Sequence, residues 1–490
     1  MCYLDLELPA VTCTGDPAKD AEAIFKAFGP LAKGEPELEY PLRTPKTLMM
    51  DYTVETIVRL LDKVGVQPGA FDGKLYGYNG VYWVELDERS FHDKIFLPVA
   101  EKTAKPCLND SIQKNLTGVY NRLACRTPTF WSFPDEFVAR IAFLNGVWAW
   151  SKEKGEEFFV HDPRHKTLSV CPYHYDPEAK CPTFDLFLDQ CLPEKQFQTR
   201  LMEVVASGLF LPGAGPKIER FVVLKGKGGN GKSTFADAIA EAFGRHNASF
   251  LSLSEIADTN PNGNFSRAAV KGKVVNIAQE TSAKPIDATY LNKFVSREPI
   301  PMCRKFEQIE YRATTCSLVV CTNERPTFMD KNDAIYRRMD IVPFEGFSSV
   351  ESTPDLSLGQ KLKEERAGVM NRILSAFARV AGQNGLTPAP KLDGYKRAYV
   401  DADDPVRYWL TYEVKWSPAG RDDAEARRIS VNDAYREYSV HCVNYGEVKM
   451  SVRKFQTRMS ELGFKSHPKK MPNGNVVRVY HYKDVPDEQL

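Results

Sequence analysis

The most regular pattern of apolar and polar residues lies near the middle of the chain. Residues 221–224 are four apolar residues in succession, which is typical of a buried parallel strand. In residues 232–243 the apolar positions recur at helical spacing, and Gly244 follows where a helix C-cap is expected. The pattern therefore predicts a strand and a helix that are joined by a short, glycine-rich connection.

Apolar runs continue to alternate with helical patterns further along the chain. Residues 273–280 and residues 317–323 predict two more buried strands, and residues 339–344 follow an arginine pair further along. Such an alternation is typical of an α/β nucleotide-binding domain with a parallel sheet. We assign residues 206–385 to this domain.

The region before this domain is less regular. Residues 1–45 are poorly patterned and rich in Pro, Gly, Glu and Lys, which predicts a loosely ordered extension. Residues 46–205 predict an α+β domain that ends in a helical connector. Asn79-Gly80 and Asn145-Gly146 are tight-turn signals within it, and residues 53–64 read as a helix.

A Pro- and Asp-containing linker at residues 386–405 separates the nucleotide-binding domain from the C-terminal part. Residues 395–490 then show three helical patterns and a hairpin that turns at Asn473-Gly474. Three helices followed by a basic hairpin predict a winged-helix domain. The fold class we expect is thus multidomain α/β, with a phosphate-loop ATPase core between an α+β domain and a winged helix.

Composition adds little to this picture. The chain has 490 residues, of which 43% are hydrophobic and 26% charged, as in a multidomain globular protein. The 65 Lys and Arg residues balance the 64 Asp and Glu residues, so the total charge does not indicate a polyanionic partner. The 11 cysteines are scattered, and no apolar run could span a bilayer, which predicts a cytoplasmic protein with reduced thiols and no membrane partner.

Local charge is more informative than total charge. Between residues 451 and 483 eight cations face one anion, Glu461, and this stripe on a helix and a hairpin suits contact with duplex DNA phosphates. A solvated face or a protein-docking surface would show the same charges. The cations that we expect to contact DNA are Arg453, Lys454, Arg458, Lys469 and Lys470.

The connection between the first strand and its helix carries the strongest chemical signal. Residues 226–233 match a phosphate-binding loop: a glycine, four residues, a glycine, a lysine and a hydroxyl. Glycine allows positive φ angles and lets backbone N–H groups approach phosphate oxygens, while the helix N-terminus favours negative charge. The expected ligands are ATP and Mg²⁺. The predicted contact residues are Gly226, Gly228, Gly229, Asn230, Gly231, Lys232, Ser233 and Thr234.

Each of these residue types has a defined task at such a loop. Lys232 would reach the β- and γ-phosphates, and the Ser233 hydroxyl would ligate Mg²⁺. Glu280, which ends the second strand, can orient Mg²⁺ or polarise the attacking water. Asn323, which ends the third strand, can hold that water or sense the γ-phosphate.

A basic pair completes the set of candidate catalytic residues. Arg337 or Arg338 can neutralise the charge that develops on the transferred phosphoryl group. Taken alone, an arginine pair is often a surface ion pair, and a carboxylate or amide at a strand end is often only solvated. Their order behind a phosphate loop favours the catalytic interpretation.

The order of these motifs resembles that of the superfamily 3 helicases, in the branch of phage, plasmid and poxvirus-type primase-helicases. The motifs run from Gly226 to Phe344, and stretches within residues 143–188 are similar to the domain that precedes the ATPase in that branch. The resemblance therefore covers roughly residues 70–345 and, more weakly, the C-terminal winged-helix segment. It implies an AAA+-like fold that assembles into a ring, usually a hexamer, with ATP between subunits. Lys232, Ser233, Glu280 and Asn323 then act in one subunit, and Arg338 or Arg337 reaches in from the next.

The resemblance also implies a basic hairpin that grips single-stranded DNA between the carboxylate and amide motifs. Residues 296–311 occupy this interval, and Arg304 and Lys305 are the candidate phosphate contacts. Two departures stand out: Gln279 takes the place of a second carboxylate beside Glu280, and residues 1–45 are too short for a primase module. A separate primase or replication initiator is therefore an expected partner.

The sequence thus predicts an ATP-dependent DNA helicase of a phage, plasmid or other mobile element, acting on single-stranded and forked DNA in the host cytoplasm. Two alternatives remain open. The first is a DNA-binding regulatory or loader ATPase that remodels a replication complex without unwinding. The second is a small-molecule or RNA-end kinase, against which the arginine pair, the amide motif and the basic C-terminal part argue.

Overall fold

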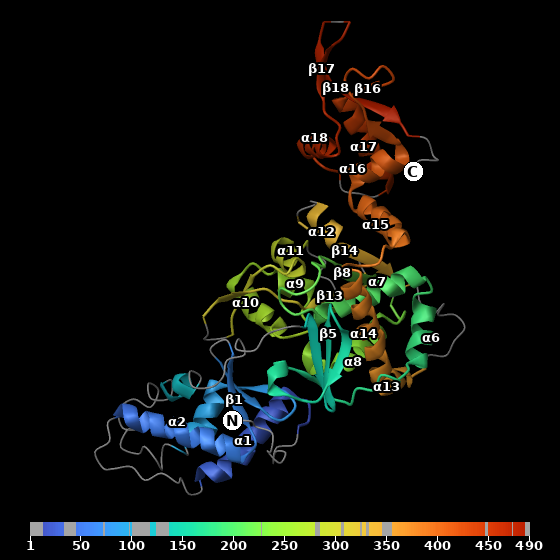
Figure 1. Cartoon of the computed structure of the whole chain (residues 1–490). Helices are drawn as coiled ribbons and strands as arrows, with labels where there is room; N and C mark the ends of the chain where they lie inside the picture. The colour runs from blue at the N-terminus through green and yellow to red at the C-terminus, as the bar shows by residue number, and fades with distance from the viewer. Residues whose placement is uncertain are drawn as a thin grey trace. The chain divides into compact units, whose positions relative to one another are not determined.

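The computed structural model describes residues 13–33, 46–71, 74–97, 99, 118–123, 137–226, 228–279, 285–304, 308–323, 326–329, 333–344, 355–445, 449–472 and 474–485 (Figure 1). The chain divides into two compact units. One comprises Met1–Asp330 with Arg337–Pro388, and the other comprises Lys331–Tyr336 with Ala389–Leu490.

The N-terminal part is built of helices around a three-stranded antiparallel sheet in the order β1-β2-β3. Asn79-Gly80 lies in the β2–β3 hairpin, as predicted, with Asn79 Oδ1 accepting hydrogen bonds from the Val81 and Tyr82 amides. The elements are α1 (Pro17–Lys33), α2 (Lys46–Lys63), β1 (Gln67–Phe71), β2 (Lys74–Tyr78), β3 (Trp83–Leu86), α3 (Glu88–Phe91) and the π-helical turn η1 (His92–Phe96).

Helix α1 corrects one prediction. A loosely ordered extension was expected over residues 1–45, but α1 packs into the core of this part through Ile24, which is fully buried. The buried Asp20 carboxylate accepts hydrogen bonds from the Thr14 amide at 2.7 Å and from the Tyr82 hydroxyl at 2.9 Å. These contacts tie residues 13–27 to the sheet, because a buried carboxylate needs its hydrogen bonds satisfied within the protein.

A second sheet has the strand order β6-β5-β4-β7 and is followed by two helices. The indole rings of Trp148 and Trp150 meet the Phe377 ring edge-on, at centroid distances of 5.8 and 6.0 Å. Because Phe377 belongs to α14 (Arg366–Gly382), the predicted domain boundary at residues 205 and 206 runs through one packed core. The elements are β4 (Ala139–Phe143), β5 (Gly146–Ser151), β6 (Gly155–Phe159), η4 (Pro163–His165), β7 (Val170–Cys171), α6 (Pro182–Cys191), α7 (Lys195–Ala206) and η5 (Ser207–Leu209).

The central sheet is parallel, with the strand order β14-β8-β13-β10-β9, and its strands are almost wholly buried (Figure 1). This confirms the strands expected near residues 221, 273 and 317, and β14 joins them in the same sheet. The elements are β8 (Phe221–Lys225), α8 (Lys232–Phe243), η6 (Arg245–Asn247), β9 (Ala248–Ser249), α9 (Leu253–Ala257), α10 (Pro261–Arg267), η7 (Ala268–Val270), β10 (Val275–Gln279), α11 (Thr289–Val295), β11 (Ile300–Met302), β12 (Glu310–Arg312), β13 (Ser317–Thr322), α12 (Asp333–Arg338), β14 (Met339–Pro343), α13 (Leu358–Glu364) and α14.

The C-terminal unit encloses a core of aromatic residues, among them Trp409, Tyr438 and Phe455. The three predicted helices and the hairpin are present, and α15 lies where a linker was predicted. The elements are α15 (Pro390–Asp403), α16 (Pro405–Tyr408), the π-helical turn η8 (Trp409–Glu413), β15 (Trp416–Pro418), β16 (Arg427–Ser430), α17 (Val431–Tyr445), α18 (Val452–Glu461), β17 (His467–Lys470) and β18 (Val476–Asp484). Strand β18 pairs with β15, β16 and β17.

An ion pair joins the first and last helices of this core. Arg458 Nε on α18 donates to Asp404 Oδ2 at 2.6 Å, and the Asp404 side chain also caps α16 by accepting from the Val406 and Arg407 amides. Both charged side chains are largely buried, with exposed fractions of 15% and 6%. The pair therefore fixes how α16 and α18 pack.

We expect Arg458→Ala to loosen this core. The substitution leaves the Asp404 carboxylate buried without its charged partner, which costs about 3 kcal/mol in comparable buried pairs. Amide hydrogen exchange in α16 and α18 of the full-length chain should become faster. Arg453→Ala, an exposed position on the same helix, is the control and should change local stability by less than about 0.5 kcal/mol. Equal hydrogen-exchange rates in the Arg458→Ala and Arg453→Ala variants would contradict this account.

Candidate functional site

The candidate phosphate loop connects β8 to α8, and its last glycine is held in a tight space. Gly231 is the N-cap residue of α8 with a φ of 88°. A Cβ atom there would lie 2.7 Å from Cys191 Sγ and 2.8 Å from a ring carbon of Phe187 on α6. Both the left-handed backbone and the packing of α6 therefore require glycine at this position.

The remaining glycines of the loop serve different purposes. Gly229 also has a positive φ, of 79°, whereas Gly226 and Gly228 do not. A Cβ on Gly226 would lie 1.9 Å from Asn230 Nδ2 and 2.1 Å from the Phe344 carbonyl oxygen. Positive φ angles, which glycine allows, thus occur at Gly229 and Gly231. At Gly226 glycine is required because a Cβ atom would clash with its neighbours.

The Lys232 side chain lies within the loop. Its ammonium donates to the Gly226 carbonyl at 2.8 Å and to Asn230 Oδ1 at 2.6 Å. Asn230 Nδ2 in turn donates to the carbonyl of Phe344, the residue after β14. Burial lowers the pKa of Lys232, whose residue is only 7% exposed. The loop therefore presents a buried cation on two neutral acceptors, which phosphate oxygens can replace.

The first turn of α8 carries the predicted hydroxyls. Ser233 is exposed and Thr234 is half-buried. No side chain caps this helix, so its N-terminal amides are not covered by a capping group. An exposed hydroxyl beside a helix N-terminus is where a phosphate-bound metal ion can be ligated.

Three parallel strands end beside the loop. Gln279 of β10 pairs with Cys321 of β13, and Thr322 pairs with Lys225 of β8, so these strand ends share one edge of the sheet. Asn323 follows β13 and is exposed. The sheet thus brings Asn323 and the phosphate loop to the same edge, while Glu280 lies outside the described residues.

The two candidate arginines differ in their surroundings. Arg338 Nε donates to Ser296 Oγ at 2.9 Å, and its Nη2 lies 3.6 Å from Glu219 Oε1, with 14% of the side chain exposed. Arg337 is exposed, and its carbonyl accepts a hydrogen bond from Arg220. Arg338 is therefore held within its own chain, whereas the Arg337 side chain faces the surface.

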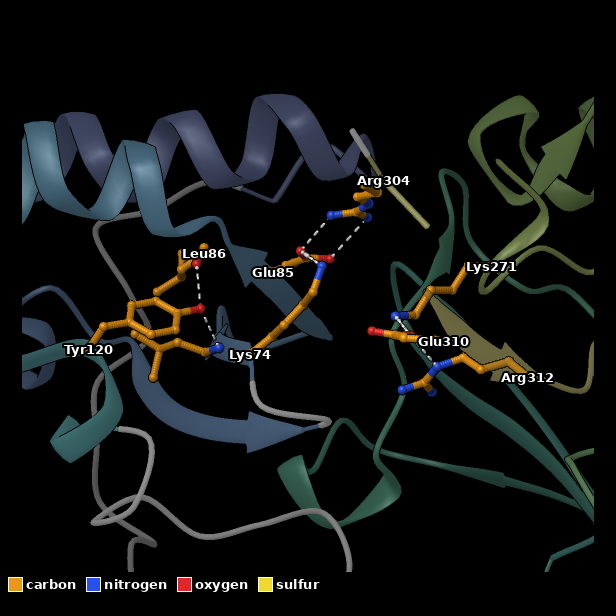
Figure 2. A network of polar contacts seen from close by, with 9 residues as sticks. Lys74, Glu85, Leu86, Tyr120, Lys271, Arg304, Glu310 and Arg312 are labelled. Atoms are coloured by element: carbon orange, nitrogen blue, oxygen red, sulfur yellow. Dashed lines mark hydrogen bonds and ion pairs between the residues drawn. The ribbon is translucent and has the colours of Figure 1, made fainter. Parts of the chain in front are cut away.

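The β11–β12 hairpin brings Arg304 into contact with the N-terminal sheet. Arg304 Nη1 lies 2.9 Å from Glu85 Oε1 and Nη2 lies 3.4 Å from Oε2, and Lys74 Nζ lies 2.9 Å from the same Oε1 (Figure 2). Lys305 lies outside the described residues. No local sequence pattern predicts this pairing, because the partners are 219 residues apart.

A buried arginine that sequence reasoning missed fixes the base of the hairpin. Arg267 is fully buried and donates to the carbonyls of Pro301, Ile256 and Asp258 and to Asn264 Oδ1. These bonds join α9, α10 and β11. Because all four acceptors are neutral, the guanidinium acts as a hydrogen-bonding hub.

The C-terminal cations divide into two groups. Arg453 and Lys454 on α18 and Lys469 and Lys470 on β17 are exposed. Arg458 was predicted to contact DNA, but its guanidinium is bound to Asp404 and Glu461 and is largely buried. That prediction is wrong for the structure described, and Arg458 stabilises the core instead.

Two family models match parts of the chain. A "Family of unknown function (DUF5906)" matches residues 224–338, and a family described as "D5 N terminal like" matches residues 48–193. Each covers less than half of the chain. Among curated proteins nothing matches.

Solved structures give only a distant likeness. "The apo structure of NrS-1 C terminal region (305-718)" and "The A form apo structure of NrS-1 C terminal region-CTR" are each 13% identical, with TM-scores of 0.48. Each comparison covers 86% of this chain and 98% of the other. At these values the likeness supports no argument about activity.

The structure itself is that of a multidomain α/β protein. Among the described helices, none combines the length and the apolar character needed to cross a membrane.

Alanine substitutions at two loop glycines should show which glycine is required because a neighbouring group leaves no room for a side chain. In Gly226→Ala the new methyl group meets Asn230 and the Phe344 carbonyl, so we expect a loss of about 1 to 3 kcal/mol in stability and weaker binding of a fluorescent ATP analogue. Gly228→Ala meets nothing within 4 Å and has no positive φ, so its stability should stay within about 0.5 kcal/mol. Thermal denaturation without nucleotide compares the two, and equal effects would refute this interpretation of the loop.

Proposed function

We propose that the chain is an ATP-dependent DNA helicase of a phage, plasmid or other mobile element, with a superfamily 3, AAA+-like ATPase core. The observation that carries the proposal is the phosphate loop at the carboxyl edge of a parallel sheet, with Lys232 buried in it. Ligands of open α/β sheets bind outside the carboxyl ends of the strands. The match of residues 48–193 to a family described as "D5 N terminal like" accords with the resemblance drawn from the motifs.

The residues present fit ATP and Mg²⁺. The left-handed backbone at Gly229 and Gly231 is of the kind that lets loop amides bind an anion, and open space surrounds Gly228 and Gly229. Lys232 would exchange the Gly226 carbonyl and Asn230 for phosphate oxygens, to which an ammonium binds more strongly. Ser233 would ligate Mg²⁺, which neutralises phosphate charge when bound.

Hydrolysis then depends on residues beside the loop. Glu280 orients the metal or the attacking water, and Asn323, at the same sheet edge, positions that water. In a ring assembly, expected to be a hexamer, an arginine from the neighbouring subunit stabilises the transferred phosphoryl group. Arg338 or Arg337 takes this role in the proposal, and the exposure of Arg337 makes it the more accessible of the two.

The DNA contacts are proposed at two places. The exposed cations of α18 and β17 suit duplex phosphates, as in a winged helix. Arg304 and Lys305, on the β11–β12 hairpin, suit single-stranded or forked DNA. A separate primase or replication initiator is the proposed protein partner, in keeping with the resemblance drawn from the motifs.

Lys232→Met tests the motor directly, because methionine keeps the apolar stem but removes the charge. We expect ATP hydrolysis to fall by about 10²-fold or more and unwinding of a forked duplex to stop. Lys217→Ala, at an exposed lysine before β8, is the control and should behave as wild type.

Unwinding by Lys232→Met at the wild-type rate would refute the proposal. DNA-stimulated ATPase activity without strand displacement in the wild type would instead support a regulatory or loader ATPase.

A further inference from the structure

Glu85 lies between two cations that come from distant parts of the chain. Its Oε1 atom accepts from Lys74 Nζ at 2.9 Å and from Arg304 Nη1 at 2.9 Å. Lys74 and Glu85 belong to the N-terminal sheet, whereas Arg304 follows β11 in the nucleotide-binding part (Figure 2). One carboxylate is thus shared by two positive charges.

The sheet holds Lys74 and Glu85 in place. Strands β2 and β3 pair antiparallel, with Tyr76 opposite Glu85. The Tyr120 hydroxyl accepts from the Leu75 amide at 2.8 Å and donates to the Leu86 carbonyl at 3.3 Å, so it clamps the residues next to Lys74 and Glu85 (Figure 2). The positions of Lys74 and Glu85 are therefore set by the sheet before any ligand binds.

The groups that Lys74 and Arg304 offer to Glu85 could also bind another anion. A guanidinium donates two parallel hydrogen bonds to a carboxylate or to a phosphate with the same geometry, and an ammonium binds either as a point charge. Burial opposes ionisation of Glu85, but the hydrogen bonds from Lys74 and Arg304 outweigh it and lower its pKa. The Glu85 carboxylate is thus ionised at neutral pH and lies between two cations.

The contact is also exchangeable. The Arg304 side chain is 49% exposed and that of Glu85 is 28% exposed. Because the Arg304 guanidinium is half exposed, its ion pair with Glu85 contributes little net free energy, and a polyanion with several phosphates can compete for it. The Lys74 side chain beside it is 17% exposed.

We propose that Lys74 and Arg304 form a composite phosphate site for single-stranded DNA, which Glu85 occupies when DNA is absent. The inference rests on the proposed DNA-binding function, and it adds Lys74 of the N-terminal sheet to the contact residues. When a backbone phosphate enters, Glu85 moves out to solvent and the internal ion pairs are replaced by phosphate contacts. The Glu85 carboxylate therefore lowers the affinity of this site for DNA, because the phosphate must displace it.

The neighbouring hairpin strand offers a matched control. Glu310 is also shared by two cations: Lys271 Nζ lies 3.2 Å and Arg312 Nε lies 2.6 Å from its Oε2 atom (Figure 2). All three residues belong to the nucleotide-binding part, so this cluster does not join it to the N-terminal sheet. Glu310→Gln and Lys271→Ala thus remove equivalent charges outside the proposed site.

The test is binding of a fluorescent oligothymidylate by the full-length chain, measured by anisotropy at several salt concentrations. Glu85→Gln should bind about two- to five-fold more tightly than wild type, which is the range expected for loss of an exposed ion pair. Lys74→Ala and Arg304→Ala should bind more weakly, each lowering the slope of affinity against salt by about one unit. Glu310→Gln and Lys271→Ala should bind as wild type.

Unchanged or weaker binding by Glu85→Gln would overturn the inference, and so would an equal gain in Glu310→Gln. Thermal denaturation of each variant shows whether a loss of binding reflects unfolding. ATP hydrolysis is measured separately, so a failed motor with an intact Glu85 effect refutes only the proposed helicase activity.

Discussion

The hydrogen bond from the Asn230 side chain to the Phe344 carbonyl is the constraint on which the candidate phosphate loop and the sheet edge beside it depend. It ties the loop after β8 to the end of β14, and it turns Asn230 Oδ1 toward the Lys232 ammonium. The bond fits only because Gly226 has no side chain. The loop shape is therefore set by the fold before any ligand binds, which lowers the cost of ordering it on binding.

A buried ion-pair cluster connects the central sheet to the arginine pair. Asp340 of β14 is fully buried, with Arg200 Nη1 2.8 Å and Arg220 Nη1 3.7 Å from its carboxylate oxygens. Arg220 also donates to the carbonyl of Arg337. Since Arg200 lies on α7, the connector helix takes part in positioning Arg337. The buried Asp340 carboxylate therefore ties β14 to α7 and to the start of β8, because a buried charge needs its partners within the protein.

Local sequence patterns predicted the parts of the fold that depend on residues close together in the sequence. The loop, the strands β8, β10 and β13 and the helix α8 follow from apolar runs and glycine positions. Helix α1 was missed because its Gly-Pro pair is typical of loops. Arg458 looked like other cations of its stripe, since its partner Asp404 lies 54 residues earlier. The pairing of Glu85 with Arg304 was likewise beyond reach, because no local pattern encodes a contact between distant segments.

The most direct test of the central claim is electron microscopy of the chain with a non-hydrolysable ATP analogue, Mg²⁺ and forked DNA. The account predicts a ring, with the analogue's phosphates on the loop amides and Lys232, Mg²⁺ at Ser233, and Arg337 of the neighbouring subunit close to the γ-phosphate. One DNA strand should pass through the channel beside the β11–β12 hairpin. A monomer, or a ring whose nucleotide lies away from Lys232, would contradict it.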